Sequence, residues 1–191
     1  MKNFVTATIV LFLSILLFSS SCSAQDIRVK TGLEVLRESG FQELKGKRVG
    51  LITNPTGVDR ELRSGVDILY RAPGVKLVAL YGPEHGVRGE YTAGEIIGSS
   101  VDPATGLKVY SLYGSTRKPT KAMLEGIDVL VYDIQDIGSR SYTFISTLGL
   151  AMEAAAENRI PFVVLARPNP LGGVRMEGPL VEPGFTSFVS Q

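Results

Sequence analysis

The sequence predicts an α/β domain in which a mainly parallel β-sheet is covered by helices on both faces. Two observations carry this prediction. Short apolar runs at residues 48–54, 75–81 and 128–133 are nearly continuous rather than alternating, as in strands that are buried on both faces. Helical patterns lie between such runs, and this order of elements is typical of a parallel sheet.

Local signals bound the individual elements. The 48–54 strand ends in Asn-Pro-Thr-Gly, which is a typical loop sequence. We expect a helix from about residue 60 to residue 70, with its apolar side chains, Leu62 included, directed towards the core. The remaining elements expected are strands at 75–81, 108–112, 128–133 and 161–166 and a helix at 142–158.

The composition is that of one globular domain. The chain has 191 residues, of which 44% are hydrophobic and 20% charged, and its formal net charge is +1. This balance gives no reason to expect a nucleic acid as partner, because phosphate binding needs a basic face. No glycine-rich loop of the kind that binds dinucleotides or nucleoside triphosphates is present, so no nucleotide is expected either.

The N-terminus has the organisation of a secretory signal. Lys2 precedes an apolar stretch at residues 4–18, and small residues follow up to Ala24. The stretch is shorter than the roughly 20 residues of a membrane-spanning helix, so we expect residues 1–24 to be a signal peptide and the chain to be exported. The only cysteine, Cys22, stands as in a lipoprotein processing site, which leaves two forms open, soluble in the periplasm or lipid-anchored to the membrane.

The loops that follow the strands hold the candidate site, because ligands of such sheets bind beyond the carboxyl ends of the strands. In the loop at 82–95, Glu84 stands in the sequence Gly-Pro-Glu-His-Gly. A glutamate at the end of a buried strand suits proton transfer or nucleophilic attack. His85 either orients its neighbours or contacts the substrate, and Arg88 is a candidate to bind a carboxylate. The alternative is a solvated turn without function.

The loop after the 128–133 strand supplies three more candidates. Gln135, Asp136 and Arg140 are expected to bind sugar hydroxyls or a carboxylate, for which a bidentate arginine is well suited. A structural reading is equally open at this stage, because an acidic residue at this place can cap the helix that follows.

The segment after the last strand completes the candidate set. Arg167 and Asn169 lie in Arg-Pro-Asn-Pro, where two prolines fix the backbone. Glu177 lies in a loop flanked by glycine and proline, which we expect to return over the strand ends. Two carboxyl groups flanking a glycosidic bond are what glycoside cleavage requires, so Glu84 and Glu177 are the predicted pair. The alternative for Glu177 is a surface glutamate in a structural loop.

The single histidine, His85, excludes several other chemistries. A zinc hydrolase would lack ligands, and a serine hydrolase would lack the Gly-x-Ser-x-Gly elbow. We therefore expect no metal and no cofactor, and carboxylate chemistry remains.

Four segments of the sequence are distinctive when they are taken together. They are Leu-Ile-Thr-Asn-Pro-Thr-Gly at 51–57, Gly-Pro-Glu-His-Gly at 82–86, Asp-Ile-Gln-Asp-Ile-Gly at 133–138 and Arg-Pro-Asn-Pro at 167–170. In this order they resemble the family of exo-acting β-N-acetylmuramidases, and the resemblance runs from about Thr31 to the end of the chain. One departure is Ala166, which stands where the family usually has an aspartate.

The resemblance implies a Rossmann-like N-terminal domain, a smaller C-terminal domain and an active site in the cleft between them. The activity that the resemblance implies is the release of terminal N-acetylmuramic acid from the non-reducing ends of peptidoglycan fragments. Glu84 and Glu177 match the glutamates of the family's motifs and are the catalytic candidates. Arg88 or Arg140 would then hold the lactyl carboxylate of the sugar. We expect residues 25–191 to be the Rossmann-like part of a chain that lacks its C-terminal domain and is therefore weakly binding or inactive alone. A non-catalytic module that binds muropeptides is the alternative, and an esterase or amidase is disfavoured.

Overall fold

The computed structural model describes residues 29–95 and 98–190. The predicted signal peptide at 1–24 and the predicted lipidation site at Cys22 lie outside the described residues. Within the described ranges, no helix has the length and apolar character needed to cross a membrane.

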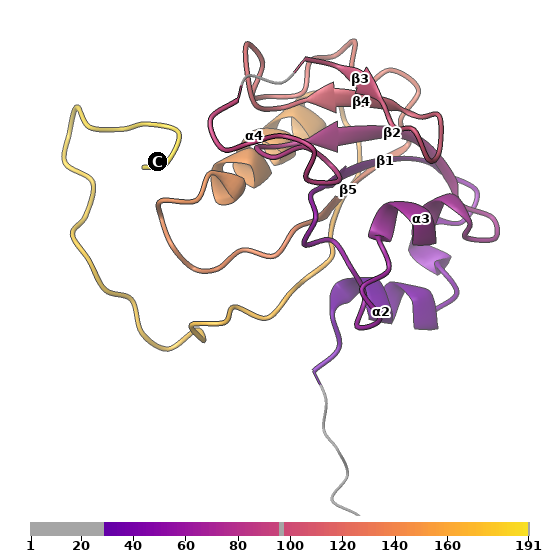
Figure 1. The fold of residues 1–191 in the computed structure, drawn as a ribbon, viewed down its shortest axis with the longest axis horizontal. Helices are drawn as coiled ribbons and strands as arrows, with labels where there is room; N and C mark the ends of the chain where they lie inside the picture. The colour runs from indigo at the N-terminus through magenta and orange to yellow at the C-terminus, as the bar shows by residue number, and fades with distance from the viewer. Residues whose placement is uncertain (1–28, 96–97, 191) are drawn as a thin grey trace, which may run out of the picture.

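Six strands form one sheet: β1 (Arg48–Thr53), β2 (Lys76–Gly82), β3 (Ser100–Val101), β4 (Lys108–Ser111), β5 (Val129–Asp133) and β6 (Phe162–Val164). Their order across the sheet is β3-β4-β2-β1-β5-β6 (Figure 1). Neighbouring strands are parallel, except that the short β3 is antiparallel to β4. From β1 the chain first builds one half of the sheet and then crosses back to β5, which is the topology of a Rossmann-like fold.

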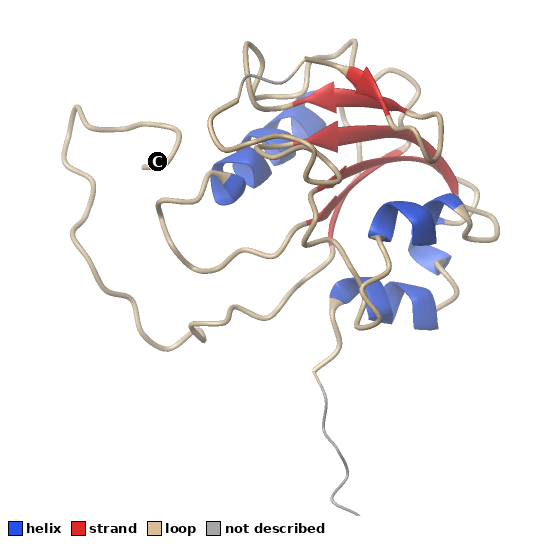
Figure 2. Ribbon diagram, in the orientation of Figure 1, coloured by secondary structure: helices blue, strands red, loops and turns tan. Residues whose placement is uncertain are grey.

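Helices cover both faces of the sheet (Figure 2). They are α2 (Gly32–Glu38), α3 (Gly65–Tyr70) and α4 (Phe144–Glu157), with a short 3-10 helix at Gln42–Leu44. Successive side chains of β1 point to opposite faces: Leu51 packs in the core that includes α2 and α3, and Ile52 packs in the core that includes α4. Both are fully buried, so the predicted sheet with helices on both faces is confirmed.

The helix expected at residues 60–70 is shorter than predicted. α3 begins only at Gly65, because the side chain of Ser64 accepts a hydrogen bond from the backbone and caps the helix. The preceding residues form a turn around the carboxylate of Asp59, which accepts hydrogen bonds from two backbone N–H groups at 3.1 and 2.9 Å. The prediction that Leu62 faces the core is therefore wrong, since Leu62 has a left-handed φ of 59° and is 80% exposed.

α2 begins with a capping box. The backbone N–H of Thr31 donates to the carboxylate of Glu34 at 2.8 Å, and the backbone N–H of Glu34 donates to Thr31 Oγ1 at 3.4 Å. Arg60 donates to the other oxygen of the Glu34 carboxylate at 2.5 Å. The hydrogen bonds that the carboxylate accepts, from Arg60 first and then from the backbone of Thr31, lower the pKa of Glu34 from its ordinary 4.5 to about 2.

Acid is therefore expected to weaken the fold through Glu34. A carboxyl group with a lower pKa in the folded than in the unfolded state stabilises the fold above its unfolded pKa, and this contribution is lost as the pH falls from about 4.5 towards 2. In Glu34→Gln we expect a shallower loss of stability over this range than in the wild type, measured by urea unfolding at several pH values. Glu38→Gln is the control, because its ion pair with Lys30 is exposed. The same pH dependence in both variants would contradict this role of Glu34.

Candidate active site

The loops after β2 and β4 meet because the two strands end in register. Gly82 at the end of β2 pairs with Ser111 at the end of β4, and the backbone N–H of Leu112 donates to the carbonyl oxygen of Gly82 at 2.8 Å. Glu84 and Tyr113 each lie two residues beyond these paired ends. The register of the sheet thus places the two side chains next to each other at its carboxyl edge.

Two hydrogen-bond donors and a tyrosine hydroxyl surround the half-buried carboxylate of Glu84. The backbone N–H of Gly94 donates to Oε1 at 3.2 Å, and Thr143, directly before α4, donates its hydroxyl to Oε2 at 3.1 Å. The hydroxyl of Tyr113 lies near the same carboxylate, and its pKa is raised first by burial and then by its interaction with Glu84. Glu84 is therefore held in one orientation where three loops meet.

The backbone after Glu84 turns sharply. His85 has a left-handed φ of 71°, which is uncommon for a residue other than glycine, and Gly86 follows with a φ of 77°. A Cβ at Gly86 would lie 2.8 Å from atoms of the Glu90 and Tyr91 side chains, so both would have to move. The Nδ1 atom of His85 lies 3.3 Å from the carbonyl oxygen of Tyr91. These contacts give His85 an orienting role in the loop, and direct contact with a substrate stays a prediction.

Arg88 is held by two aspartates. Its Nε lies 2.5 Å from Asp102 Oδ1, and its Nη2 lies 2.8 Å from Asp67 Oδ1. The hydrogen bonds to Asp102 and Asp67, in this order, raise the pKa of Arg88. Because Asp67 belongs to α3 and Asp102 directly follows β3, Arg88 ties the Glu84 loop to two other parts of the fold. Because two carboxylates already match its charge, Arg88 has a structural role here, and its contact with a lactyl carboxylate stays a prediction.

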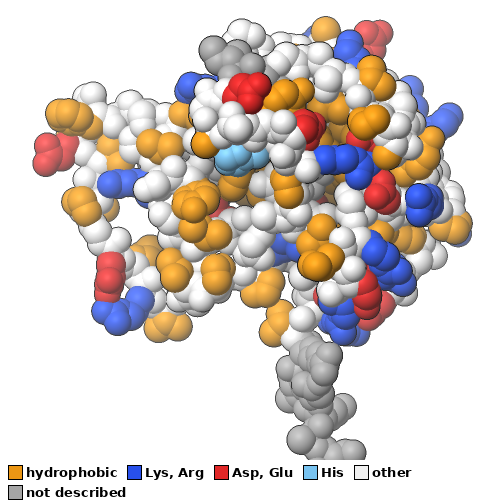
Figure 3. Space-filling model, in the orientation of Figure 1, with side chains coloured by type: hydrophobic (Ala, Val, Ile, Leu, Met, Phe, Trp, Pro, Cys, Tyr) orange, Lys and Arg blue, Asp and Glu red, His pale blue; other side chains and the backbone are white. Residues whose placement is uncertain are grey.

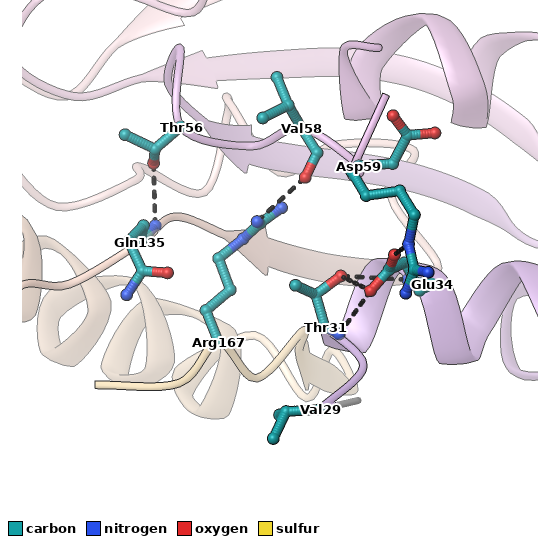
Figure 4. Close-up of a pocket in the computed structure, with 9 residues that line it drawn as sticks. Val29, Thr31, Glu34, Thr56, Val58, Asp59, Gln135 and Arg167 are labelled. Carbon is teal, nitrogen blue, oxygen red and sulfur yellow. Dashed lines mark hydrogen bonds and ion pairs between the residues drawn. The ribbon is translucent and has the colours of Figure 1, made fainter. Parts of the chain in front are cut away.

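A cavity of about 700 Å³ opens beyond the carboxyl ends of β1 and β5 (Figure 4). The chain reverses its direction across the sheet between these two strands, and ligands of α/β sheets bind at such switch points. Two of the predicted site residues, Gln135 and Arg167, line this cavity. Its full lining comprises Val29, Thr31, Glu34, Thr56, Val58, Asp59, Arg60, Gln135 and Arg167.

Arg167 forms a buried ion pair with Asp133 at the end of β5. Its Nε and Nη2 donate to the two carboxylate oxygens at 2.6 and 3.0 Å, and its Nη1 donates to the carbonyl oxygen of Val58 at 3.0 Å. Burial raises the pKa of Asp133, and the hydrogen bond and charge of Arg167 oppose that rise. The guanidinium thus fixes the wall of the cavity, and its contact with a sugar stays a prediction.

Asp136 keeps one acceptor available. Its Oδ1 accepts a hydrogen bond from the backbone N–H of Gly138 at 2.6 Å, whereas its Oδ2 is buried and has no hydrogen-bond partner among the residues described. A buried acceptor of this kind is costly unless a donor reaches it, so Asp136 suits a sugar hydroxyl. In the described part of the chain, no group of three or more Asp, Glu, His or Cys side chains is arranged to hold a metal ion.

The loops after β5 and β6 interlock. The side-chain amide of Gln135 donates to the carbonyl oxygens of Asp136 and Pro168 at 2.6 and 2.8 Å. A Cβ at Gly138, which has a φ of 75°, would lie 2.7 Å from Oδ1 of Asn169, so the Asn169 side chain lies directly on this glycine. The structure thus brings the loop of Gln135 and Asp136 together with the Arg-Pro-Asn-Pro segment that holds Asn169.

Glu177 lies apart from this arrangement, on an extended segment at residues 168–190 that leaves the sheet as an open arc (Figure 1). Its carboxylate is 68% exposed and pairs with Arg175. Arg140, in the loop before α4, donates to the carbonyl oxygen of Pro179 at 3.0 Å and thereby ties the arc to the body of the domain. Apolar side chains are exposed along the arc, as Figure 3 shows. The pairing of Glu177 with Glu84 stays a prediction.

Tyr113 and Thr143 are the residues at Glu84 that sequence reasoning missed. Tyr113 directly follows the strand predicted at 108–112, so the rule that strand-end residues form the site could have found it. Thr143 lies inside the helix predicted at 142–158, and no local signal distinguishes it from a helical residue.

Comparisons with known proteins confirm the resemblance of the sequence. The family model described as "Exo-beta-N-acetylmuramidase NamZ, N-terminal" matches residues 49–191. The "Peptidoglycan beta-N-acetylmuramidase NamZ" of Bacillus subtilis (strain 168) is 56% identical over 171 residues, which cover 90% of this chain and 41% of that protein. The chain thus spans less than half the length of this relative.

Two crystal structures of proteins from Bacteroides fragilis NCTC 9343, both described as members of the DUF1343 family, share the fold. One is 66% identical with a TM-score of 0.80, and the match covers 86% of this chain and 41% of that one. The other is 33% identical with a TM-score of 0.71, and the match covers 85% and 41%. The chain belongs to the family of NamZ exo-β-N-acetylmuramidases and carries its N-terminal part.

Proposed function

We propose that this chain is the catalytic N-terminal part of an enzyme that releases terminal N-acetylmuramic acid from the non-reducing ends of peptidoglycan fragments. The observation that carries the proposal is the carboxylate of Glu84, held at the carboxyl edge of the sheet by hydrogen bonds from Gly94 and Thr143, in a chain of this family. The name of the B. subtilis relative supports peptidoglycan as the substrate class.

The proposed chemistry uses two carboxyl groups. In glycoside cleavage one carboxyl protonates the glycosidic oxygen, while the other assists attack at the anomeric carbon. Glu84 is one of them, and its half-buried place beside Tyr113 and Thr143 suits a group that must hold its orientation during proton transfer or attack. We keep Glu177 as the second carboxyl, which requires the arc at 168–190 to bring it over Glu84.

The proposed sugar site extends from Glu84 towards the cavity between β1 and β5. Asp136 offers its free carboxylate oxygen to a sugar hydroxyl. Gln135, Asn169 and Arg167 hold the loops that shape this region, as their contacts with neighbouring backbone and side chains support.

The proposed substrate lies outside the cytoplasm, and the sequence of residues 1–24 supports delivery to that place. We propose the periplasm as the location of this chain, either as a soluble protein or anchored through a lipid on Cys22.

Turnover separates the proposed enzyme from a non-catalytic module that binds muropeptides. The full-length protein is expected to release free N-acetylmuramic acid from a chromogenic β-glycoside of this sugar and from muropeptides that carry it at the non-reducing end, detected by absorbance and mass spectrometry. The corresponding glycoside of N-acetylglucosamine is the matched control and should be cleaved far more slowly. Saturable binding without product after long incubation would support the binding module instead.

A further inference from the structure

We propose that Arg117 binds the lactyl carboxylate of N-acetylmuramic acid and thereby selects this sugar over N-acetylglucosamine. This inference rests on the proposed function and names the residue that recognises the group by which the two sugars differ. A guanidinium suits this task because its planar fork can donate two parallel hydrogen bonds to a carboxylate.

Arg117 belongs to the loop that follows β4, which begins beside the loop of Glu84. The register of β2 and β4 places Tyr113 beside Glu84, and Arg117 follows Tyr113 by four residues in the same loop. The positive charge of Arg117 acts on the hydroxyl of Tyr113 and lowers its pKa, against the larger raising effects of burial and of Glu84. The hydroxyl of Tyr113 thus interacts with both Glu84 and Arg117, so the guanidinium belongs to the surroundings of the proposed sugar site.

The positive charge of Arg117 is also available to bind a ligand carboxylate. Two of the arginines predicted for the site are matched by acids: Arg88 by Asp67 and Asp102, and Arg167 by Asp133. Arg117 is exposed, and within residues 29–95 and 98–190 it forms no ion pair with an acidic side chain. A carboxylate ligand would therefore meet a cation that no residue of the described structure has neutralised.

The guanidinium of Arg117 is oriented by an aromatic ring. Its central carbon lies 4.4 Å from the centre of the Phe188 ring, in a cation–π contact. A guanidinium has several N–H donors, so a contact with one ring leaves donors for a carboxylate. Because the side chain is already held, less conformational entropy is lost when a carboxylate binds.

Arg140 is the competing candidate. It lies three residues before Thr143, whose hydroxyl donates to Glu84, and it too is exposed. One of its N–H groups is used by the carbonyl oxygen of Pro179. Both arginines contact the segment at 168–190, so Arg140 is a matched control for Arg117.

The test compares the binding of two ligands that differ only in the carboxylate, free N-acetylmuramic acid and its methyl ester. Calorimetry with the full-length protein measures both, so the result does not depend on turnover. We expect the wild type to bind the acid at least about tenfold more tightly than the ester, because hydrogen bonds to a charged partner are the strong ones. Arg117→Gln is expected to bind both alike, and Arg140→Gln to keep the preference, with circular dichroism showing that both variants are folded.

Two outcomes would overturn the inference. One is a wild type that binds acid and ester equally or binds neither detectably. The other is a preference that survives in Arg117→Gln, above all if it disappears in Arg140→Gln. A wild type that prefers the acid through Arg117 but releases no sugar would refute the proposed function and leave this assignment in place.

Discussion

Replacement of Glu84 by glutamine is expected to lower kcat for the release of N-acetylmuramic acid by about 100- to 10,000-fold. Glutamine keeps the size of the side chain, but it can neither exchange a proton with the glycosidic oxygen nor attack the anomeric carbon. The amide oxygen can still accept a hydrogen bond from Thr143, so the loops around Glu84 should keep their arrangement. The loss should therefore appear in kcat, with little change in KM or in thermal stability.

Steady-state kinetics with the chromogenic glycoside measures this loss of kcat, and other variants show how large it is by comparison. Tyr113→Phe and Thr143→Val each remove one hydroxyl beside Glu84, and we expect losses of up to about 10- to 150-fold because a hydrogen bond to a charged group is worth roughly 1.5–3 kcal/mol. Glu90→Gln is the matched control, since Glu90 lies in the same loop but is exposed and bonds only to the backbone N–H of Arg88 among the residues described. Full activity of Glu84→Gln would remove Glu84 from the mechanism.

The strands and the position of Glu84 could be predicted because both depend on local sequence. A strand buried on both faces must be apolar along its whole length, so β1, β2 and β5 are visible as apolar runs. The loop after such a strand lies at the carboxyl edge of the sheet, which places Glu84 without further information. Tyr113 becomes its neighbour only through the register of β2 and β4, and apolar patterns do not encode register between parallel strands.

The misplaced start of α3 and the absence of α2 from the predicted elements have a different cause, which is the chemistry of helix ends. The apolar periodicity of residues 60–70 continues through Leu62, but the carboxylate of Asp59 and the cap at Ser64 hold the backbone in a turn there. Conversely, α2 carries a clear start signal in its capping box, Thr31 with Glu34, which periodicity alone does not show. Capping residues therefore decide where these helices begin.

The arginines show why the binding residues could not be ranked from the sequence. Three arginines lie in strand-end loops of the predicted site: Arg88, Arg140 and Arg167. Whether each can bind a ligand carboxylate depends on whether the fold brings an acidic side chain to its guanidinium. Asp102 reaches Arg88 and Asp133 reaches Arg167 only in the folded chain. Among the residues described, no acid pairs with Arg117, and the ring of Phe188 contacts it from a distant segment.

The buried ion pair of Arg167 and Asp133 carries the largest effect expected on stability. Arg167→Met should lower the free energy of unfolding by about 3–5 kcal/mol, because the Asp133 carboxylate, which is 1% exposed, would remain buried without its partner. Burial already raises the pKa of Asp133, and loss of Arg167 removes the contact that opposes this rise. A carboxyl whose folded pKa lies above its unfolded pKa destabilises the fold at high pH, and this penalty disappears as the pH falls through the folded pKa. The deficit of the variant should therefore shrink in acid.

Arg48→Met is the matched control for burial. Nε and Nη2 of Arg48 donate to the carboxylate of Asp128 at 3.0 and 2.8 Å, in the same arrangement as Arg167 and Asp133. This pair lies at the surface, with the two side chains 50% and 39% exposed. Water can solvate Asp128 after the arginine is removed, so urea unfolding of Arg48→Met should show a much smaller loss. Equal losses in the two variants would show that burial of Asp133 is not the cause. A deficit of Arg167→Met that stays constant from neutral to acidic pH would show that the unpaired carboxylate is not its source, and the lost contact with the Val58 carbonyl would then be the better explanation.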